Sequence, residues 1–194
     1  STEVQIGRPE SAVADLDAGI GPPESPVPLD QESAIQALAL AQMGRLDDAA
    51  AIARDHADAW QDSAFAMSAM VVVLAAGGDV DGAIDAAVRF ATLERSTYLD
   101  QVTADLALAL LDPGESGDPV IDRARSIADA TDDQVCHALC ALASAVRLEV
   151  SGRDADDALD DSERRLAVLG LTDARWREVY RTIAGFGAAR QSAG

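Results

Sequence analysis

The feature that most constrains the fold of this chain is a helical pattern that turns and repeats every 34 residues. Gly44 and Gly78 each interrupt a run of apolar residues with helical spacing, and each is followed five residues later by an alanine, Ala49 or Ala83. The two glycines, like the two alanines, are 34 residues apart. A glycine between two amphipathic segments predicts an αα-hairpin. The repeated spacing therefore predicts a stack of helical hairpins.

The third and fourth units follow the same design with one insertion. Ala124 and Ala158 are again 34 residues apart, whereas the step from Ala83 to Ala124 is 41 residues. The seven extra residues fall in the turn-rich segment 112–119, where Asp118 is the predicted N-cap and Pro119 the first helical residue. The fourth unit is predicted over 132–169, with its turn at 151–152.

Two segments flank the predicted units. Residues 1–29 form an N-terminal extension, in which 19–28 hold four of the seven prolines and predict an extended linker, because proline lacks a backbone N–H. A short helix is predicted before it, over 9–16. Residues 30–194 form the helical part, which ends in a closing helix capped by Thr172 or Asp173. Its apolar stripe consists of Trp176, Val179, Tyr180, Ile183 and Phe186.

From Asp30 to Gly194 the chain resembles a divergent member of the tetratricopeptide repeat (TPR) family. Segments 43–49 and 77–83 fit the turn of that family, although most of its large aromatic residues are replaced by Ala, Leu or Val. The family's small residues at helix crossings correspond to Ala37, Val71 and Ala145 in first helices and Ala49, Ala83, Ala124 and Ala158 in second helices. The resemblance implies an all-α solenoid, a TPR-like superhelix of about four hairpins with a C-terminal capping helix. A compact, non-repeating helical bundle is the alternative.

TPR solenoids bind peptides or partner domains on a concave face lined by the first helix of each unit. Alignment through Gly44, Gly78 and Gly152 predicts the groove residues of this chain. They are Ala34, Leu38, Ala41, Phe65, Ser68, Val72, Ala75, Leu142, Val146 and Glu149. Such a groove is apolar and weakly acidic, and it suits a hydrophobic or arginine-containing segment. We expect residues 1–20 or a second subunit to cover it, because exposed apolar surface of that extent is a liability.

Charge excludes some partners and predicts a docking surface. All 15 basic residues are arginine, and they face 34 acidic residues, for a net charge of −19. Such a surface repels phosphate backbones and anionic lipids, which argues against nucleic-acid and membrane partners. The segment 162–194, however, has a net charge of +3. Its Arg175, Arg177 and Arg181 predict docking on an acidic face of the same chain, a second copy or a partner. Solvated arginines that balance local acids are the alternative.

Two cysteines raise the question of metal or redox chemistry. Cys136 and Cys140 lie at i and i+4 of a predicted helix, while His137 points about 100° away from Cys136. Two thiolates are fewer than a tetrahedral metal site needs. We therefore predict buried cysteines and no metal or cofactor. A thiol- or metal-responsive sensor centred on these cysteines is the alternative function.

The sequence contains no recognisable catalytic motif. No phosphate-binding loop or dinucleotide fingerprint is present, and two His with no Lys leave few nucleophile–base arrangements. A hydrolase that uses acidic pairs would need a pocket with several perturbed carboxylates. The longest near-apolar stretch, 64–76, is shorter than the ~20 residues of a membrane span. The sequence therefore predicts a non-enzymatic, cytoplasmic scaffold that binds a protein or peptide, as part of a larger regulator by analogy.

Overall fold

The structure of this chain is a computed structural model that describes residues 9–17, 29–94, 96–112, 114, 117–169 and 174–192. These residues form eleven helices and no strand, which confirms the all-α class predicted from the apolar periodicity. The helices are α2 (Pro9–Asp17), α3 (Leu29–Gln42), α4 (Leu46–Asp55), α5 (Ala57–Trp60), α6 (Ala64–Ala76), α7 (Val80–Phe90), α8 (Tyr98–Leu111), α9 (Asp118–Thr131), α10 (Gln134–Val150), α11 (Asp156–Val168) and α12 (Ala174–Ser192).

Consecutive helices form four pairs, and three of the pairs turn at a glycine as predicted. The pairs are α3 with α4, α6 with α7, α8 with α9, and α10 with α11. Gly44, Gly78 and Gly152 have φ values of 76°, 80° and 67°, a left-handed conformation that favours glycine. After each glycine the next backbone N–H bonds back to a carbonyl five residues earlier, as in Arg45 to Leu40. These bonds satisfy carbonyls that the end of a helix leaves unpaired.

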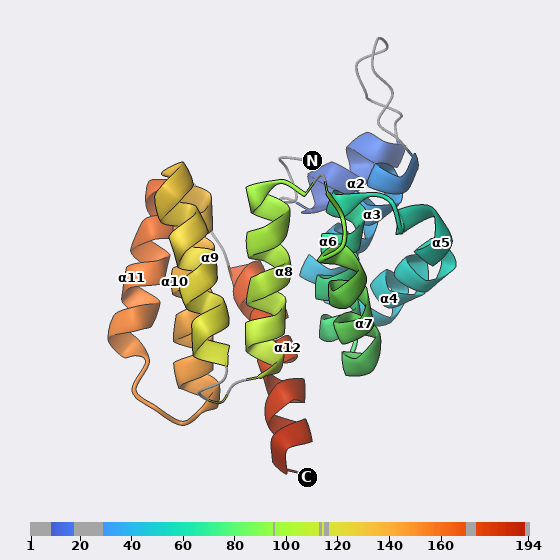
Figure 1. Ribbon diagram of the computed structural model, residues 1–194. Helices are drawn as coiled ribbons and strands as arrows, with labels where there is room; N and C mark the ends of the chain where they lie inside the picture. The colour runs from blue at the N-terminus through green and yellow to red at the C-terminus, as the bar shows by residue number, and fades with distance from the viewer. Residues whose placement is uncertain are drawn as a thin grey trace.

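The four pairs lie side by side, from α3 and α4 on the right of Figure 1 to α10 and α11 on the left. The first helix of each pair contacts the first helix of the next, in the order α3, α6, α8 and α10. Six of the seven small residues predicted at helix crossings are completely buried, which lets the helix axes approach closely. The seventh, Ala158 on α11, is partly exposed because it lines a cavity between α9, α10 and α11.

The closing helix does not cap the end of the array, so this part of the prediction is wrong. α12 contacts all four first helices and passes behind α8 in the view of Figure 1. Trp176, Val179, Tyr180 and Ile183 are buried, as expected of its apolar stripe, whereas Phe186 is 40% exposed and lies against Gly78. The four first helices together bury most of the apolar stripe of α12, which removes that surface from water.

The remaining predicted boundaries are close to those in the structure. α2 confirms the short helix predicted over 9–16 and packs on α3, while the proline-rich segment 19–28 and the predicted cap residues Thr172 and Asp173 lie outside the described residues. α9 begins at Asp118 with Gly117 as its N-cap, one residue earlier than predicted, because the Asp118 carboxylate binds Arg147 instead of capping the helix. None of the described helices is both long and apolar enough to cross a membrane.

Candidate functional site

The ten predicted groove residues lie on first helices, but they do not line an open groove. Eight are buried, and only Phe65 and Glu149 are partly exposed. We call the surface of α3, α6, α8 and α10 that contacts α12 the α12 face. The expectation that residues 1–20 or a second subunit cover this face is therefore corrected, because a later helix of the same chain lies there. Of residues 1–20, those at 1–8 and 18–20 lie outside the described residues.

Trp176, near the start of α12, packs among predicted groove residues. It lines a small cavity of about 30 Å³ together with Leu38, Phe65 and Ser68. The rings of Trp176 and Tyr180 are tilted against each other with centroids 5.6 Å apart, a favourable aromatic arrangement. The aromatic end of α12 is thus fixed by contacts with several first helices at once.

The sequence prediction missed the part of this face that α8 contributes. Leu99 and Thr103 of α8 line the same small cavity as Trp176. The alignment used the turn glycines, and the third pair has a long loop at the corresponding place, so α8 could not be placed in register. The apolar periodicity of 98–111 was the available signal for these residues.

A bidentate ion pair joins the polar edge of α12 to α10. Arg181 donates from Nε to Glu149 Oε2 at 2.9 Å and from Nη2 to Glu149 Oε1 at 2.5 Å. This fork geometry combines charge attraction with a fixed orientation. The hydrogen bonds from Arg181 hold the pKa of the Glu149 carboxyl below its ordinary value, and the same pair raises the pKa of Arg181. Glu149 was a predicted groove residue, and its role in the structure is to receive this arginine.

Other arginines of α12 also pair with acids of the same chain. Arg177 Nη1 lies 3.2 Å from Glu163 Oε1 on α11, and Arg175 Nη1 lies 2.6 Å from Glu10 Oε2 on α2. Arg190 pairs with α7 through Asp81, at 2.9 Å. Exposed pairs contribute little stability each, so their main effect is to orient α12. Of the three acidic partners considered for this basic helix, the structure therefore pairs it with its own chain.

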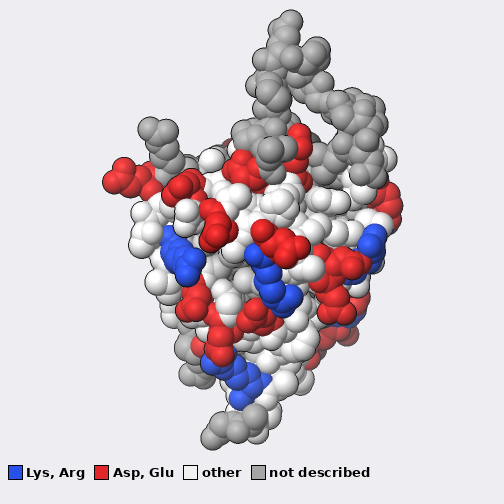
Figure 2. Space-filling model, turned by 90° about the vertical axis from the view of Figure 1, so that its right-hand side faces the viewer, with Lys and Arg blue, Asp and Glu red and all other residues white. Residues whose placement is uncertain are grey.

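On the side of the molecule that lies to the right in Figure 1, acidic side chains outnumber arginines. Figure 2 shows them spread over this side with arginines interspersed among them. Like charges on such a surface repel a polyanion such as nucleic acid. The rest of the chain is thus negatively charged, whereas segment 162–194, which contains α12, is positively charged.

Both cysteines are poorly placed for metal or redox chemistry. Cys136 and Cys140 are free thiols with exposed fractions of 0% and 1%. Burial raises the pKa of the Cys136 thiol to about 12 and that of Cys140 to about 11. A buried thiol with a raised pKa is a weak nucleophile and metal ligand. Within the described ranges, no group of three or more His, Cys, Asp or Glu could hold a metal ion.

We expect both thiols to be unreactive in the folded protein. With a pKa of about 11, roughly one thiol in a thousand is ionised at pH 8. Ellman's reagent at pH 8 should therefore label neither cysteine within minutes in buffer and both in 8 M urea, as measured by absorbance. Rapid labelling of one thiol per native chain would contradict this expectation and favour the thiol sensor.

Comparisons with known proteins do not identify a family for this chain. No protein-family model matches it, and no significant match was found among curated proteins or solved structures.

Proposed function

We propose that this chain is a non-enzymatic scaffold, a TPR-like array of four hairpins whose α12 face binds an amphipathic helix bearing arginines. The observation that carries this proposal is the position of α12, which contacts the first helix of every pair. In the folded chain α12 is the intramolecular occupant of the site. A partner helix with the same chemistry would replace it. A cytoplasmic location and a place in a larger regulator stay predictions.

The TPR-like description rests on local geometry that recurs with the sequence period. Gly44 and Gly78, which are 34 residues apart, end α3 and α6 with the same left-handed turn and the same pattern of backbone hydrogen bonds. The first helices are neighbours in chain order. Stacked units of this kind bury their apolar faces against each other and leave one extended face for a ligand.

α12 indicates which partner chemistry the face accepts. Trp176, Tyr180 and Ile183 stand at positions i, i+4 and i+7, the spacing of anchors in a helix that binds a groove. Arg181, directly after the second anchor, donates two hydrogen bonds from its guanidinium to the carboxylate of Glu149. A partner helix would therefore present three large apolar anchors at this spacing and an arginine beside the second.

A labelled peptide with the sequence of residues 174–192 tests whether α12 can be exchanged. Arg181→Gln in the full chain weakens the contact of the protein with its own α12 but keeps the Glu149 carboxylate, which then pairs, among the described residues, only with Arg177 at 3.8 Å. The peptide should therefore bind this variant about tenfold more tightly than wild type. Glu149→Gln loses the same ion pair but also removes the acceptor for the peptide arginine. It should therefore bind the peptide more weakly than Arg181→Gln, as measured by fluorescence anisotropy.

The two variants control for each other, because both lose the ion pair between Arg181 and Glu149. Each also loses one further pair, Arg181 with Glu178 or Arg177 with Glu149. A second peptide that carries glutamine at position 181 should bind both variants equally. If none of the proteins binds the first peptide at concentrations up to about 1 mM, α12 is a fixed part of the core and the proposal fails. Equal binding of the first peptide to both variants would overturn the role of Glu149 in recognition.

A further inference from the structure

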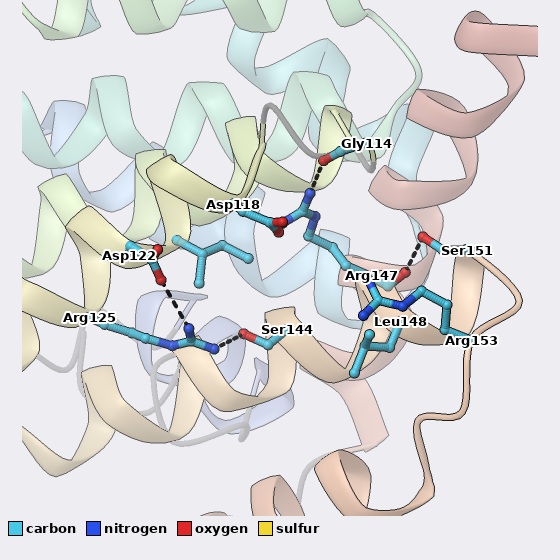
Figure 3. Close-up of a pocket in the computed structure, with 10 residues that line it drawn as sticks. Gly114, Asp118, Asp122, Arg125, Ser144, Arg147, Leu148, Ser151 and Arg153 are labelled. Carbon is cyan, nitrogen blue, oxygen red and sulfur yellow. Dashed lines mark hydrogen bonds and ion pairs between the residues drawn. The ribbon is translucent and has the colours of Figure 1, made fainter.

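A cavity of about 610 Å³ lies between α9 and α10, and none of its lining residues belongs to α12. Its volume is within the range of small-molecule sites. Figure 3 shows three arginines in its walls, Arg125, Arg147 and Arg153, together with two acids, Asp118 and Asp122. The local charge is therefore positive in a chain whose net charge is −19.

Arg147 forms a fixed, buried part of this cavity. It is 6% exposed, and its Nη1 lies 2.5 Å from Asp118 Oδ1. Its Nη2 donates to the carbonyl oxygens of Asp112 and Gly114. Nε is also buried and has no acceptor among the described residues. A buried guanidinium held in this way keeps its position when a ligand enters.

Arg125 and Arg153 present guanidinium groups that are more accessible. Arg125 comes from α9 and donates to Asp122 at 3.1 Å and to Ser144 of α10 at 2.7 Å. Arg153 follows α10, lines the cavity, and forms no ion pair with an acid in the described part of the chain. Figure 3 shows the two groups on opposite sides of the cavity.

The cavity also has apolar surface and an excess of donors. Ile121, which is buried, and Leu148 also line it. Three guanidinium groups carry fifteen N–H donors, and only five hydrogen bonds join them to the described residues. The unmet donors suit a ligand that carries only acceptors and has an apolar part.

We propose that this cavity binds a small organic anion, whose phosphate or carboxylate oxygens accept hydrogen bonds from Arg125 and Arg153 and whose apolar part packs on Ile121 and Leu148. Guanidinium groups bind both kinds of anion through paired, charge-assisted hydrogen bonds. The acidic surface of the chain repels a polyanion, but it costs a ligand with one or two charges much less. An inorganic anion would leave most of the cavity volume empty.

Titration calorimetry with the full chain in 0.15 M NaCl tests this site with three probes, phenyl phosphate, benzoate and inorganic phosphate. We expect phenyl phosphate or benzoate to bind one per chain with a Kd of about 1 mM or below, about tenfold tighter than inorganic phosphate. The tighter of the two organic probes identifies the anionic group that the site prefers. Arg125→Gln and Arg153→Gln should each weaken that probe about tenfold.

Arg45→Gln is the matched control, because Arg45 also pairs with an aspartate three residues away and is similarly exposed, but lies on the turn before α4. It should bind the probes as wild type does. The proposal is overturned if neither organic probe binds wild type at about 10 mM, or if the two cavity variants bind as tightly as Arg45→Gln. Equal affinity for inorganic phosphate and phenyl phosphate would overturn the role of the apolar wall.

Discussion

Replacing Ile183 by alanine should lower the free energy of unfolding by about 3 kcal/mol. Ile183 is completely buried on the stripe of α12 that meets the first helices. The change removes three carbon atoms from a close-packed interior, and the neighbouring helix backbones cannot move enough to fill the space. The midpoint and slope of a urea unfolding curve measure the loss.

Ile84→Ala is the matched comparison, because it removes the same atoms from a side chain on α7 that is 40% exposed. It should cost less than about 1 kcal/mol, since little buried volume is lost. If both variants lose the same stability, then α12 does not pack on the first helices as the structure has it. A loss at position 183 alone supports the packing of α12 on the first helices.

Replacing Gly187 by alanine should destabilise the protein by about 2 kcal/mol, although alanine favours a helix. A Cβ at this position would lie 2.4 Å from the carbonyl oxygen of Leu111 and 2.7 Å from its carbonyl carbon. Both atoms belong to the backbone at the end of α8, so no flexible side chain can move aside. α12 would have to shift away from α8, which opens the interface between them.

Gly185→Ala makes the same change two residues earlier on the same helix and should have the opposite effect. Gly185 is exposed, and a Cβ there would meet nothing within 4 Å. Only the higher helix propensity of alanine then acts, which should stabilise the protein by about 1 kcal/mol. Thermal and urea unfolding of both variants measure whether each substitution raises or lowers the free energy of unfolding. Stabilisation by both substitutions would show that α12 and α8 are further apart than in the structure.

Local patterns in the sequence were sufficient to predict most helices and three of the four turns. The glycines at 44, 78 and 152 could be identified because a left-handed turn at the end of a helix favours one residue type. The start of α9 was misplaced by one residue because Asp118 is a good capping residue by type. Its carboxylate has a stronger partner in Arg147, 29 residues away, which no local pattern reveals.

The position of α12 could not be predicted from its own residues. A stripe such as Trp176, Tyr180 and Ile183 has the same form in a helix that caps an array and in one that lies across it. The choice depends on which other surfaces remain uncovered, and that is a property of the whole fold. The opposite charges of segment 162–194 and the rest of the chain indicated an acidic docking surface. That surface could equally belong to the same chain, to a second copy or to another protein.

The arginine cavity was missed for a related reason. Arg147 stands within an apolar stretch of α10, between Val146 and Leu148, and a single charge in such a stretch resembles a surface position. Its burial follows from the loop before α9, which supplies two carbonyl oxygens, and from Asp118. The signal that could have drawn attention to it is the apolar residue on either side.

The place of α12 against the first helices also fixes an order of events during synthesis of the chain. α3 ends at Gln42 and α12 begins at Ala174, so the ribosome needs roughly 7 to 26 seconds between them at about 5–20 residues per second. Throughout that interval the nascent array has no α12 to cover its apolar face. Chaperones that hold nascent chains therefore have their greatest opportunity to bind this protein before its last described helix is made.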